Sequence, residues 1–150
     1  MIPFFTLVPG ALWPVLPVGI HDATMQEVHD RYVLNERRKQ LFEGFERAAG
    51  NIFAAGSPQI YLDGSYVTAK PDPNDYDALW DRRYVNPHLL DPLFLELRFG
   101  TDKQKAKYLG EFFPSAAVEA KSGKPFLEFF MTDRITGMKK GIIRIINYLN

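Results

Sequence analysis

The segment Gln59–Asp81 constrains the fold more than any other part of the chain, because it contains two short apolar runs with distinctive residues between them. The first run, Ile60–Leu62, leads into Gly64-Ser65. After a spacer of nine residues, Asp75-Tyr76-Asp77 opens a second apolar run that ends at Trp80. Apolar runs of this length, bounded by Gly, Pro, Asn and Asp, are typical of strands. The segment therefore predicts two strands that flank a Gly-Ser turn and a proline-stiffened loop.

The acidic pair at the start of the second strand is the main candidate for chemistry. Alternate residues of a strand point to the same face, so Asp75 and Asp77 are expected to lie side by side. Two like charges this close repel each other, and a cation between them relieves the repulsion. Mg²⁺ binds carboxylate oxygens together with substrate phosphates. The alternative is a pair of solvated residues on an edge strand, but the run Ala78–Trp80 is too apolar for a free edge.

This pattern of Gly-Ser, spacer and Asp-x-Asp resembles the signature of the nucleotidyltransferase (polymerase beta-like) superfamily. The resemblance implies that Asp75 and Asp77 hold Mg²⁺ or Mn²⁺ and that Gly64 and Ser65 contact a nucleoside triphosphate. Glycine allows the backbone to approach phosphates closely, and exposed N–H groups can cradle them. Alone, Gly64-Ser65 is equally compatible with an ordinary tight turn.

The superfamily also carries a third metal-binding carboxylate on a later strand. Glu119, flanked by Ala116-Ala117-Val118 and Ala120, is the best candidate for a third ligand on such a strand. Glu128 and Asp133 are the alternatives, although the sequence around them favours a helix. An exposed, purely structural Glu119 remains the other interpretation.

A closer likeness extends over most of the chain. It is carried by the segments Leu16–Thr24, Glu36–Leu41, Tyr61–Thr68 and Met138–Ile145. These resemble a family of small uncharacterised prokaryotic and phage proteins, in which a proline-rich arm, a helix, the Gly-Ser and Asp-x-Asp core and a terminal Lys-Gly strand recur. The likeness implies a nucleotidyltransferase-like fold more strongly than it implies a substrate.

The composition predicts one globular domain preceded by an arm. The 150 residues contain 18 basic and 18 acidic residues, so no overall positive charge favours nucleic acid. There are no cysteines, which is compatible with a cytoplasmic location. No apolar run approaches the roughly 20 residues of a membrane-spanning helix. Because prolines interrupt the first 20 residues, we expect a proline-rich N-terminal arm over 1–22 and a single domain over 23–150.

The remaining pattern predicts an α+β fold, a mixed sheet with helices on one face. Thr24 and Glu27 form a capping box for a helix ending near Tyr32, and Asn35 caps a longer helix that stops at Gly56-Ser57-Pro58. The range 89–113 reads as mostly helical, with an interruption near Gly100. We further expect a strand around Glu119, a short helix over 126–131 and a buried strand over 142–146.

Several other residues have both a structural and a functional interpretation. Lys70, on the loop after Gly64-Ser65, is the nearest candidate for a phosphate contact, with Arg82 and Arg83 as more distant ones. The cluster Arg134, Lys139 and Lys140 either contacts a phosphate or balances the acids. The three histidines and the phenylalanines near the C-terminus are assigned to structure rather than to a metal or a base: His21, His29, His88, Phe126, Phe129 and Phe130.

The leading hypothesis is a metal-dependent nucleotidyltransferase that moves NMP from an NTP to a hydroxyl of an RNA end, a protein or a small molecule. The resemblance also suggests a toxin–antitoxin or defence system and a partner protein or homodimer that supplies acceptor-binding surfaces. The alternative is a catalytically inert binding or regulatory module of the same fold, such as an antitoxin partner. A nuclease or phosphohydrolase that uses the same acids is the third possibility.

Overall fold

The structure, a computed structural model, describes residues 1–133 and 136–149 and contains a mixed β-sheet. The five strands that it describes lie in the order β1-β5-β2-β3-β4. β1 is parallel to β5 and β3 to β4, whereas β2 is antiparallel to both of its neighbours. The strands are β1 (Gly19–Asp22), β2 (Gln59–Asp63), β3 (Tyr76–Trp80), β4 (Gly110–Pro114) and β5 (Gly141–Ile146).

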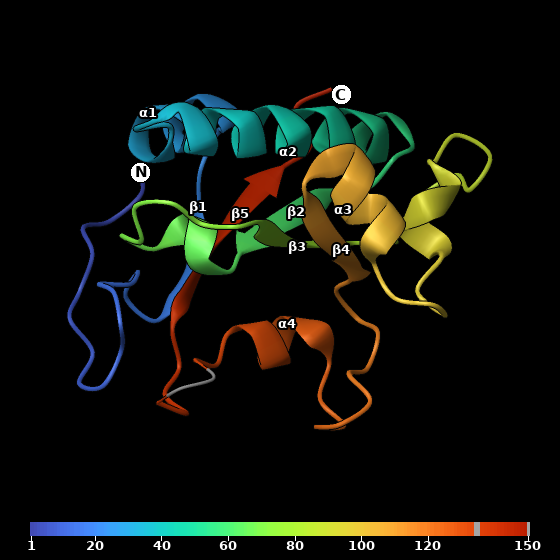
Figure 1. Ribbon diagram of the computed structural model, residues 1–150. Coiled ribbons are helices and arrows are strands. Elements are labelled where there is room, and N and C mark those ends of the chain that lie inside the picture. The colour runs from blue at the N-terminus through green and yellow to red at the C-terminus, as the bar shows by residue number, and fades with distance from the viewer. Residues whose placement is uncertain (134–135, 150) are drawn as a thin grey trace.

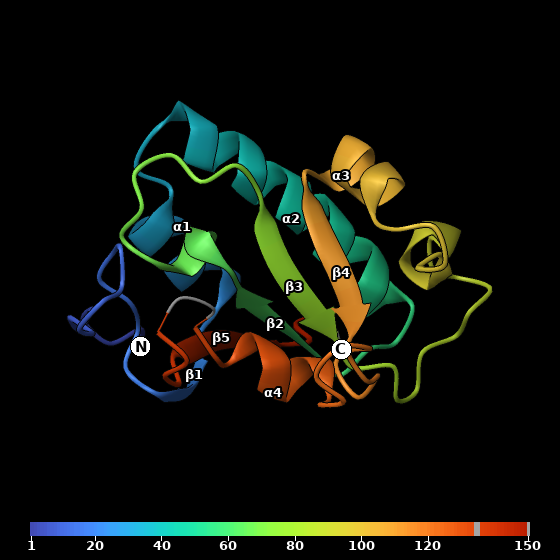
Figure 2. The ribbon, with the colours of Figure 1, turned by 60° about the horizontal axis from the view of Figure 1, so that its bottom comes forward.

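Helices lie on both faces of this sheet (Figures 1 and 2). α1 and α2 cover one face, and α4 lies across the opposite face. α3 belongs to the crossover between the parallel strands β3 and β4 and lies beside the sheet edge (Figure 2). The helices are α1 (Met25–Tyr32), α2 (Glu36–Ala54), α3 (Asp102–Tyr108) and α4 (Phe126–Phe130), with 3-10 turns η1 (Ser65–Val67) and η2 (Pro92–Leu95). The expectation that helices cover one face is therefore wrong for α4.

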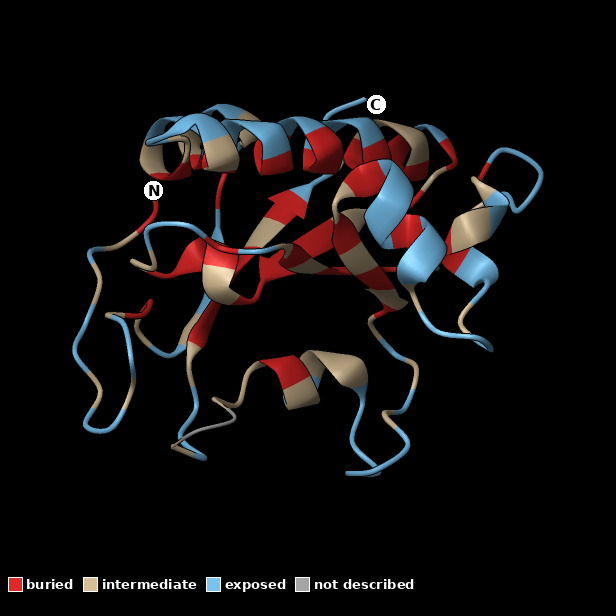
Figure 3. Cartoon of the chain, viewed as in Figure 1, coloured by how far each residue is buried: buried red, intermediate tan, exposed pale blue. Residues whose placement is uncertain are grey.

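The main hydrophobic core lies between α2 and the sheet. One stripe of α2 is buried, as its helical spacing predicted, while its opposite face is exposed (Figure 3). From the sheet, the residues that point to this core include Ile60, Ala78 and Phe112. Their strand neighbours point to the other face. There a smaller cluster packs beneath α4 and comprises Tyr61, Leu79, Phe130 and Ile142.

Most elements predicted from the sequence are confirmed. α1 begins with the predicted capping box, in which Thr24 Oγ1 accepts from Glu27 N at 3.0 Å. α2 begins at the predicted cap, where Asn35 Oδ1 accepts from Arg38 N at 2.8 Å. β2, β3 and β5 occupy the three predicted apolar runs, and α4 occupies the predicted short helix. An α+β fold with a mixed sheet is therefore what this chain adopts.

Two predictions about elements are wrong. Only residues 102–108 of the range 89–113 are α-helical, and this range ends in strand β4 instead. The helix stops because Leu109 adopts a left-handed conformation, φ 67°, and Gly110 lies against the ring of Tyr76, where a Cβ would be 2.4 Å from ring carbons. The expected strand around Glu119 is a turn-rich loop. The last four residues of the expected arm, Gly19–Asp22, form β1, which pairs with β5 in the sheet.

The N-terminal segment, residues 1–18, contacts α1 and the main core before β1 begins. Thr6 and Val15 exchange two backbone hydrogen bonds, 2.7 and 3.0 Å, so residues 6–15 double back on themselves. Ile2 and Leu16 belong to the main core. None of the helices within residues 1–133 and 136–149 combines the length and the apolar character needed to cross a membrane.

Candidate functional site

Three neighbouring strands bring carboxylates into one row on the face of the sheet that carries α4. In the antiparallel pair β2–β3, Asp63 lies opposite Asp77. In the parallel pair β3–β4, Asp77 lies beside Glu111. Residues opposite each other in a sheet have Cβ atoms roughly 5 Å apart, so these three side chains are neighbours. We call Asp63, Asp77 and Glu111 the acid row.

Asp75 joins the acid row from the residue before β3, and all of these except Asp63 line one cavity. This cavity has a volume of about 420 Å³. The predicted phosphate contacts Gly64, Ser65 and Lys70 line it as well. The structure therefore brings together the two predicted aspartates and the Gly-Ser turn, which are separated by nine residues in the sequence.

Gly64 makes the contact between the turn and the acid row. Its φ is +80°, a conformation that favours glycine, and an added Cβ would lie 2.5 Å from Asp77 Oδ2. Glycine thus allows the backbone to approach the Asp77 carboxylate directly. The turn continues as η1, in which Thr68 Oγ1 donates to Ser65 O at 2.6 Å.

The pKa of Asp77 reflects its burial and the neighbouring carboxylates. Burial is the largest cause that raises the pKa of the Asp77 carboxyl, to about 7. The negative charges of Asp63, Asp75 and Glu111 act in the same direction, whereas Lys140 opposes them. Lys140 Nζ lies 3.5 Å from Asp63 Oδ1, which is fully buried. The row is therefore an environment in which additional positive charge is favourable.

One lysine already occupies part of this environment. Lys105 Nζ on α3 lies 3.0 Å from Glu111 Oε1 and 3.6 Å from Asp75 Oδ2. Thr101 Oγ1 donates to the other oxygen of Glu111 at 2.9 Å. The Lys105 ammonium stands where a cation would contact both carboxylates. Within residues 1–133 and 136–149, no three His, Asp or Glu side chains are arranged as a ready metal-ligand set.

The structure places the predicted third acid, Glu119, outside the site. Its carboxylate accepts backbone hydrogen bonds from Lys121, 3.1 Å, and Ser122, 2.6 Å, within the loop after β4. These bonds, led by the one from Ser122, lower the pKa of the Glu119 carboxyl. Glu111 occupies the place on a later strand that the prediction gave to Glu119. Gly-Glu-Phe-Phe-Pro shows no alternation of apolar and polar residues that would mark a strand, so the sequence offered no local signal for Glu111.

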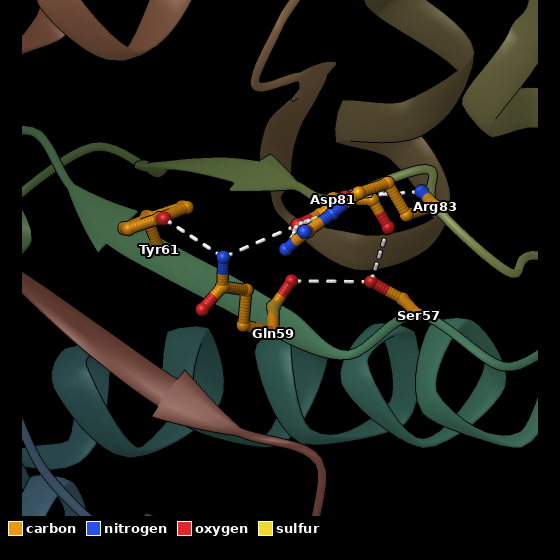
Figure 4. A network of polar contacts seen from close by, with 5 residues as sticks. All are labelled: Ser57, Gln59, Tyr61, Asp81 and Arg83. Carbon is orange, nitrogen blue, oxygen red and sulfur yellow. Dashed lines mark hydrogen bonds and ion pairs between the residues drawn. The ribbon is translucent and has the colours of Figure 1, made fainter.

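The other candidates divide in the same way. Asp133 and Lys140 line the cavity, whereas Glu128, Arg82, Arg83 and Lys139 are not among its lining residues. Arg83 lies beyond the far end of β3, where it forms an ion pair with Asp81 (Figure 4). Its Nε donates to both carboxylate oxygens, Oδ1 at 3.1 Å and Oδ2 at 3.0 Å, and its Nη2 donates to Oδ2 at 2.7 Å. Arg134, part of the predicted basic cluster, lies outside the described residues.

The remaining predictions concern histidines and phenylalanines. His21 Nε2 lies 2.7 Å from Pro17 O, and His29 packs edge-on against Phe42, so both have structural surroundings. Phe126, Phe129 and Phe130 belong to the smaller hydrophobic cluster, as predicted. Phe129 and Phe130 additionally line the cavity, which the sequence did not indicate.

The fold and site define a small α+β protein that carries an acidic cavity at one end of a mixed sheet. The chain belongs to the DUF6932 family, a family of unknown function, whose family model matches residues 12–146. The matched range contains the acid row, the Gly-Ser turn and every residue that lines the cavity except Ala11. The comparisons with curated proteins and with solved structures found no match.

Proposed function

We propose that this protein is a metal-dependent nucleotidyltransferase with a nucleotidyltransferase-like fold, which transfers NMP from an NTP to a hydroxyl group. One observation carries the proposal. Asp75, Asp77 and Glu111 line a single cavity together with Gly64 and Ser65, and Asp63 lies opposite Asp77 in the sheet. Carboxylates that face a glycine turn suit the binding of a cation together with a phosphate chain.

Each group has a defined role in this proposal. Asp75, Asp77 and Glu111 would hold Mg²⁺ or Mn²⁺, which when bound activates the acceptor hydroxyl and neutralises the leaving pyrophosphate. The donors are all carboxylate oxygens, which is the chemistry that these ions prefer. The backbone of Gly64-Ser65 and the ammonium of Lys70 bind the triphosphate and orient it. Catalysis then depends mainly on positioning and charge stabilisation.

Lys105 fits this proposal as a built-in counter-ion. Its side chain is 44% exposed, so it can swing towards solvent when a divalent cation enters between Asp75 and Glu111. A lysine side chain has a flexible four-carbon stem, and this movement requires no change in the backbone. The ion pairs of Lys105 keep the acids partly neutralised until metal arrives.

The acceptor and the biological setting are part of the proposal. We infer that the acceptor is an RNA end, a protein side chain or a small molecule, and that a partner chain or a second copy supplies the surface that holds it. A toxin–antitoxin or defence role in the cytoplasm, where NTPs and Mg²⁺ are abundant, is the setting that we favour.

Incubation with each labelled NTP, Mg²⁺ or Mn²⁺ and total RNA or lysate tests the proposal. We expect label on one acceptor class, and Asp75→Ala or Asp77→Ala is expected to reduce transfer by at least about two orders of magnitude. Full transfer by both variants would refute the assigned site. Release of phosphate without transfer would point to a phosphohydrolase.

Glu111 and Glu119 provide a matched pair of variants. Glu111→Ala removes a carboxylate from the acid row and is expected to abolish most transfer. Glu119→Ala removes a carboxylate that only binds its own loop and is expected to leave transfer within about twofold of the wild type. Equal effects of the two substitutions would contradict the assignment of Glu111 as the third acid.

The second candidate is a catalytically inert binding or regulatory module of the same fold. The observation that favours it is the contact of Lys105 with both Asp75 and Glu111, because a permanent ammonium there would replace a metal. Calorimetric titration with each NTP in Mg²⁺ and in Mn²⁺ separates the two functions. Binding of an NTP in the presence of Mg²⁺ or Mn²⁺ supports the enzyme. No binding of any NTP in either metal supports the inert module.

A further inference from the structure

We propose that the apolar part of the cavity lining is a nucleobase subsite, in which the indole of Trp13 stacks on the base of the bound NTP. This inference rests on the proposed function and adds to it the part of the substrate that the acids do not contact. It also gives the N-terminal segment a role in binding. The observations that carry it are the mixed lining of the cavity, the exposure of Trp13 and the attachment of its backbone.

The lining of the cavity is chemically mixed. It includes the carboxylates of Asp75, Asp77 and Glu111 and the Gly-Ser turn. It also includes apolar side chains from two segments distant in the sequence, Leu12 and Trp13 from the N-terminal segment and Phe129 from α4. A ligand that uses both kinds of lining needs an anionic or metal-binding end and a flat apolar end. A nucleoside triphosphate has both, and about 420 Å³ is within the range of small-molecule sites.

The two tryptophans of the chain have opposite surroundings. Trp80 is only 1% exposed and belongs to the main core, whereas Trp13 is 38% exposed and lines the cavity. A tryptophan that is needed only for packing is normally covered, as Trp80 is. The partly open ring of Trp13 instead offers a large, rigid surface to a planar ligand at a low cost in conformational entropy.

Trp13 is held in place relative to the phosphate-binding turn. Pro14 O accepts a hydrogen bond from Ala69 N at 3.0 Å, which ties the residue after Trp13 to the loop that follows Gly64-Ser65. Val15 pairs with Thr6, and its side chain is buried. The proline at position 14 also restricts the backbone of Trp13 to extended conformations. The backbone that carries the indole is therefore attached to the loop that follows the turn.

Stacking predicts a particular specificity. Every base has an aromatic face, so stacking tolerates all four bases. The side chains of Leu12, Trp13 and Phe129 are apolar apart from the indole N–H, and they offer few hydrogen-bond partners to the edges of a base. We therefore expect the four NTPs to bind within about tenfold of one another, with purines tighter because their rings are larger.

Calorimetry in Mg²⁺ with ATP and with inorganic tripolyphosphate tests the subsite. In the wild type we expect ATP to bind about tenfold more tightly than tripolyphosphate. Trp13→Ala is expected to weaken ATP binding about tenfold while tripolyphosphate binding stays the same, and Trp13→Phe is expected to recover most of the loss. Because Trp13 is partly exposed, both variants should keep the wild-type circular dichroism spectrum.

Fluorescence gives an independent readout. The Trp13 signal is the difference between the wild type and Trp13→Phe, and ATP should quench it while tripolyphosphate should not. If ATP and tripolyphosphate bind equally and Trp13→Ala changes neither, the subsite is refuted and the proposed function stands. If neither ligand binds the wild type in Mg²⁺ or Mn²⁺, the proposed function fails and the subsite fails with it.

Discussion

The carboxyl group of Asp77 carries much of the electrostatic strain of the site. It lies between Asp63 and Glu111 in the sheet register, and its carboxylate touches the backbone of Gly64. Its pKa is raised from the ordinary aspartate value of 3.8 to about 7. At a pH between these two values, the carboxyl group is protonated in the metal-free folded protein and ionised in the unfolded chain. A bound cation would remove this difference, since it favours the charged carboxylate.

The stability of the metal-free protein should therefore fall as pH rises. Between about pH 4 and pH 7 the folded state binds more protons at Asp77 than the unfolded state does, so the free energy of unfolding decreases with pH. From pH 5 to pH 8 we expect Asp77 to account for a loss of about 1–2 kcal/mol, discounted for partial exposure. Urea denaturation in EDTA measures it. Asp77→Asn should lose less stability over this range, and an equal loss would contradict the assignment.

At this scale the sequence predicted part of the site. Asp75, Asp77, Gly64 and Ser65 were found because their spacing is local and strand alternation fixes their side. Glu111 was missed because its place beside Asp77 depends on the pairing of β3 with β4, which no local pattern records. The alanine-rich sequence around Glu119 predicted a strand, but turn residues follow Glu119. Its carboxylate accepts hydrogen bonds from the backbone amides of Lys121 and Ser122.

At the scale of elements, the first turn of α2 holds the loop between the Gly-Ser turn and Asp75. Arg38 is buried, and its guanidinium donates to Tyr66 O, Thr68 O and Lys70 O at 2.7, 3.0 and 2.6 Å. Arg37 donates to Pro73 O and Asn74 O of the same loop. The helix thus fixes a loop whose ends carry both halves of the candidate site.

Arg38→Met should therefore affect both stability and ligand binding. It leaves three loop carbonyls without their donor, which we expect to cost about 2–4 kcal/mol of unfolding free energy. Because the loop then no longer fixes Gly64 and Lys70, NTP affinity should fall at least about tenfold at a temperature where the variant remains folded. Urea denaturation and calorimetry check the two effects. Lys39→Met, on the exposed face of the same helix turn, should change neither, and wild-type NTP affinity in Arg38→Met would refute the positioning role.

The elements themselves were predictable to different degrees for a physical reason. α1 and α2 have capping residues and long apolar stripes, which are local signals. β1 and β4 are the two edge strands of the sheet. Each is defined by its pairing with a strand distant in the sequence, β5 or β3, and not by a local sequence pattern. β1 follows four prolines, which favour an arm, although its backbone completes the sheet beside β5.

At the scale of the whole molecule, the sheet separates two hydrophobic clusters of unequal size. The larger one lies under α2, and the smaller one lies under α4, a helix of five residues. Residues 115–133 contact the sheet through this smaller cluster, and they supply Phe129, Thr132 and Asp133 to the cavity. The α+β class followed from the order of elements, but this division did not, because it depends on which face each short helix covers.

This architecture predicts which backbone amides will exchange more slowly when a ligand binds. In the free protein, amide hydrogens of residues 115–133 should exchange faster than those of β2, β3 and β5, because few buried contacts hold this segment. With Mg²⁺ and an NTP at ten times the dissociation constant, exchange of the amides of residues 129–133 should slow about tenfold. Hydrogen–deuterium exchange with mass spectrometry measures both rates.

Residues 82–89, none of which lines the cavity, serve as the internal control and should keep their exchange rate. Asp77→Ala should lose the protection, and protection confined to some other surface would place the ligand elsewhere on the molecule.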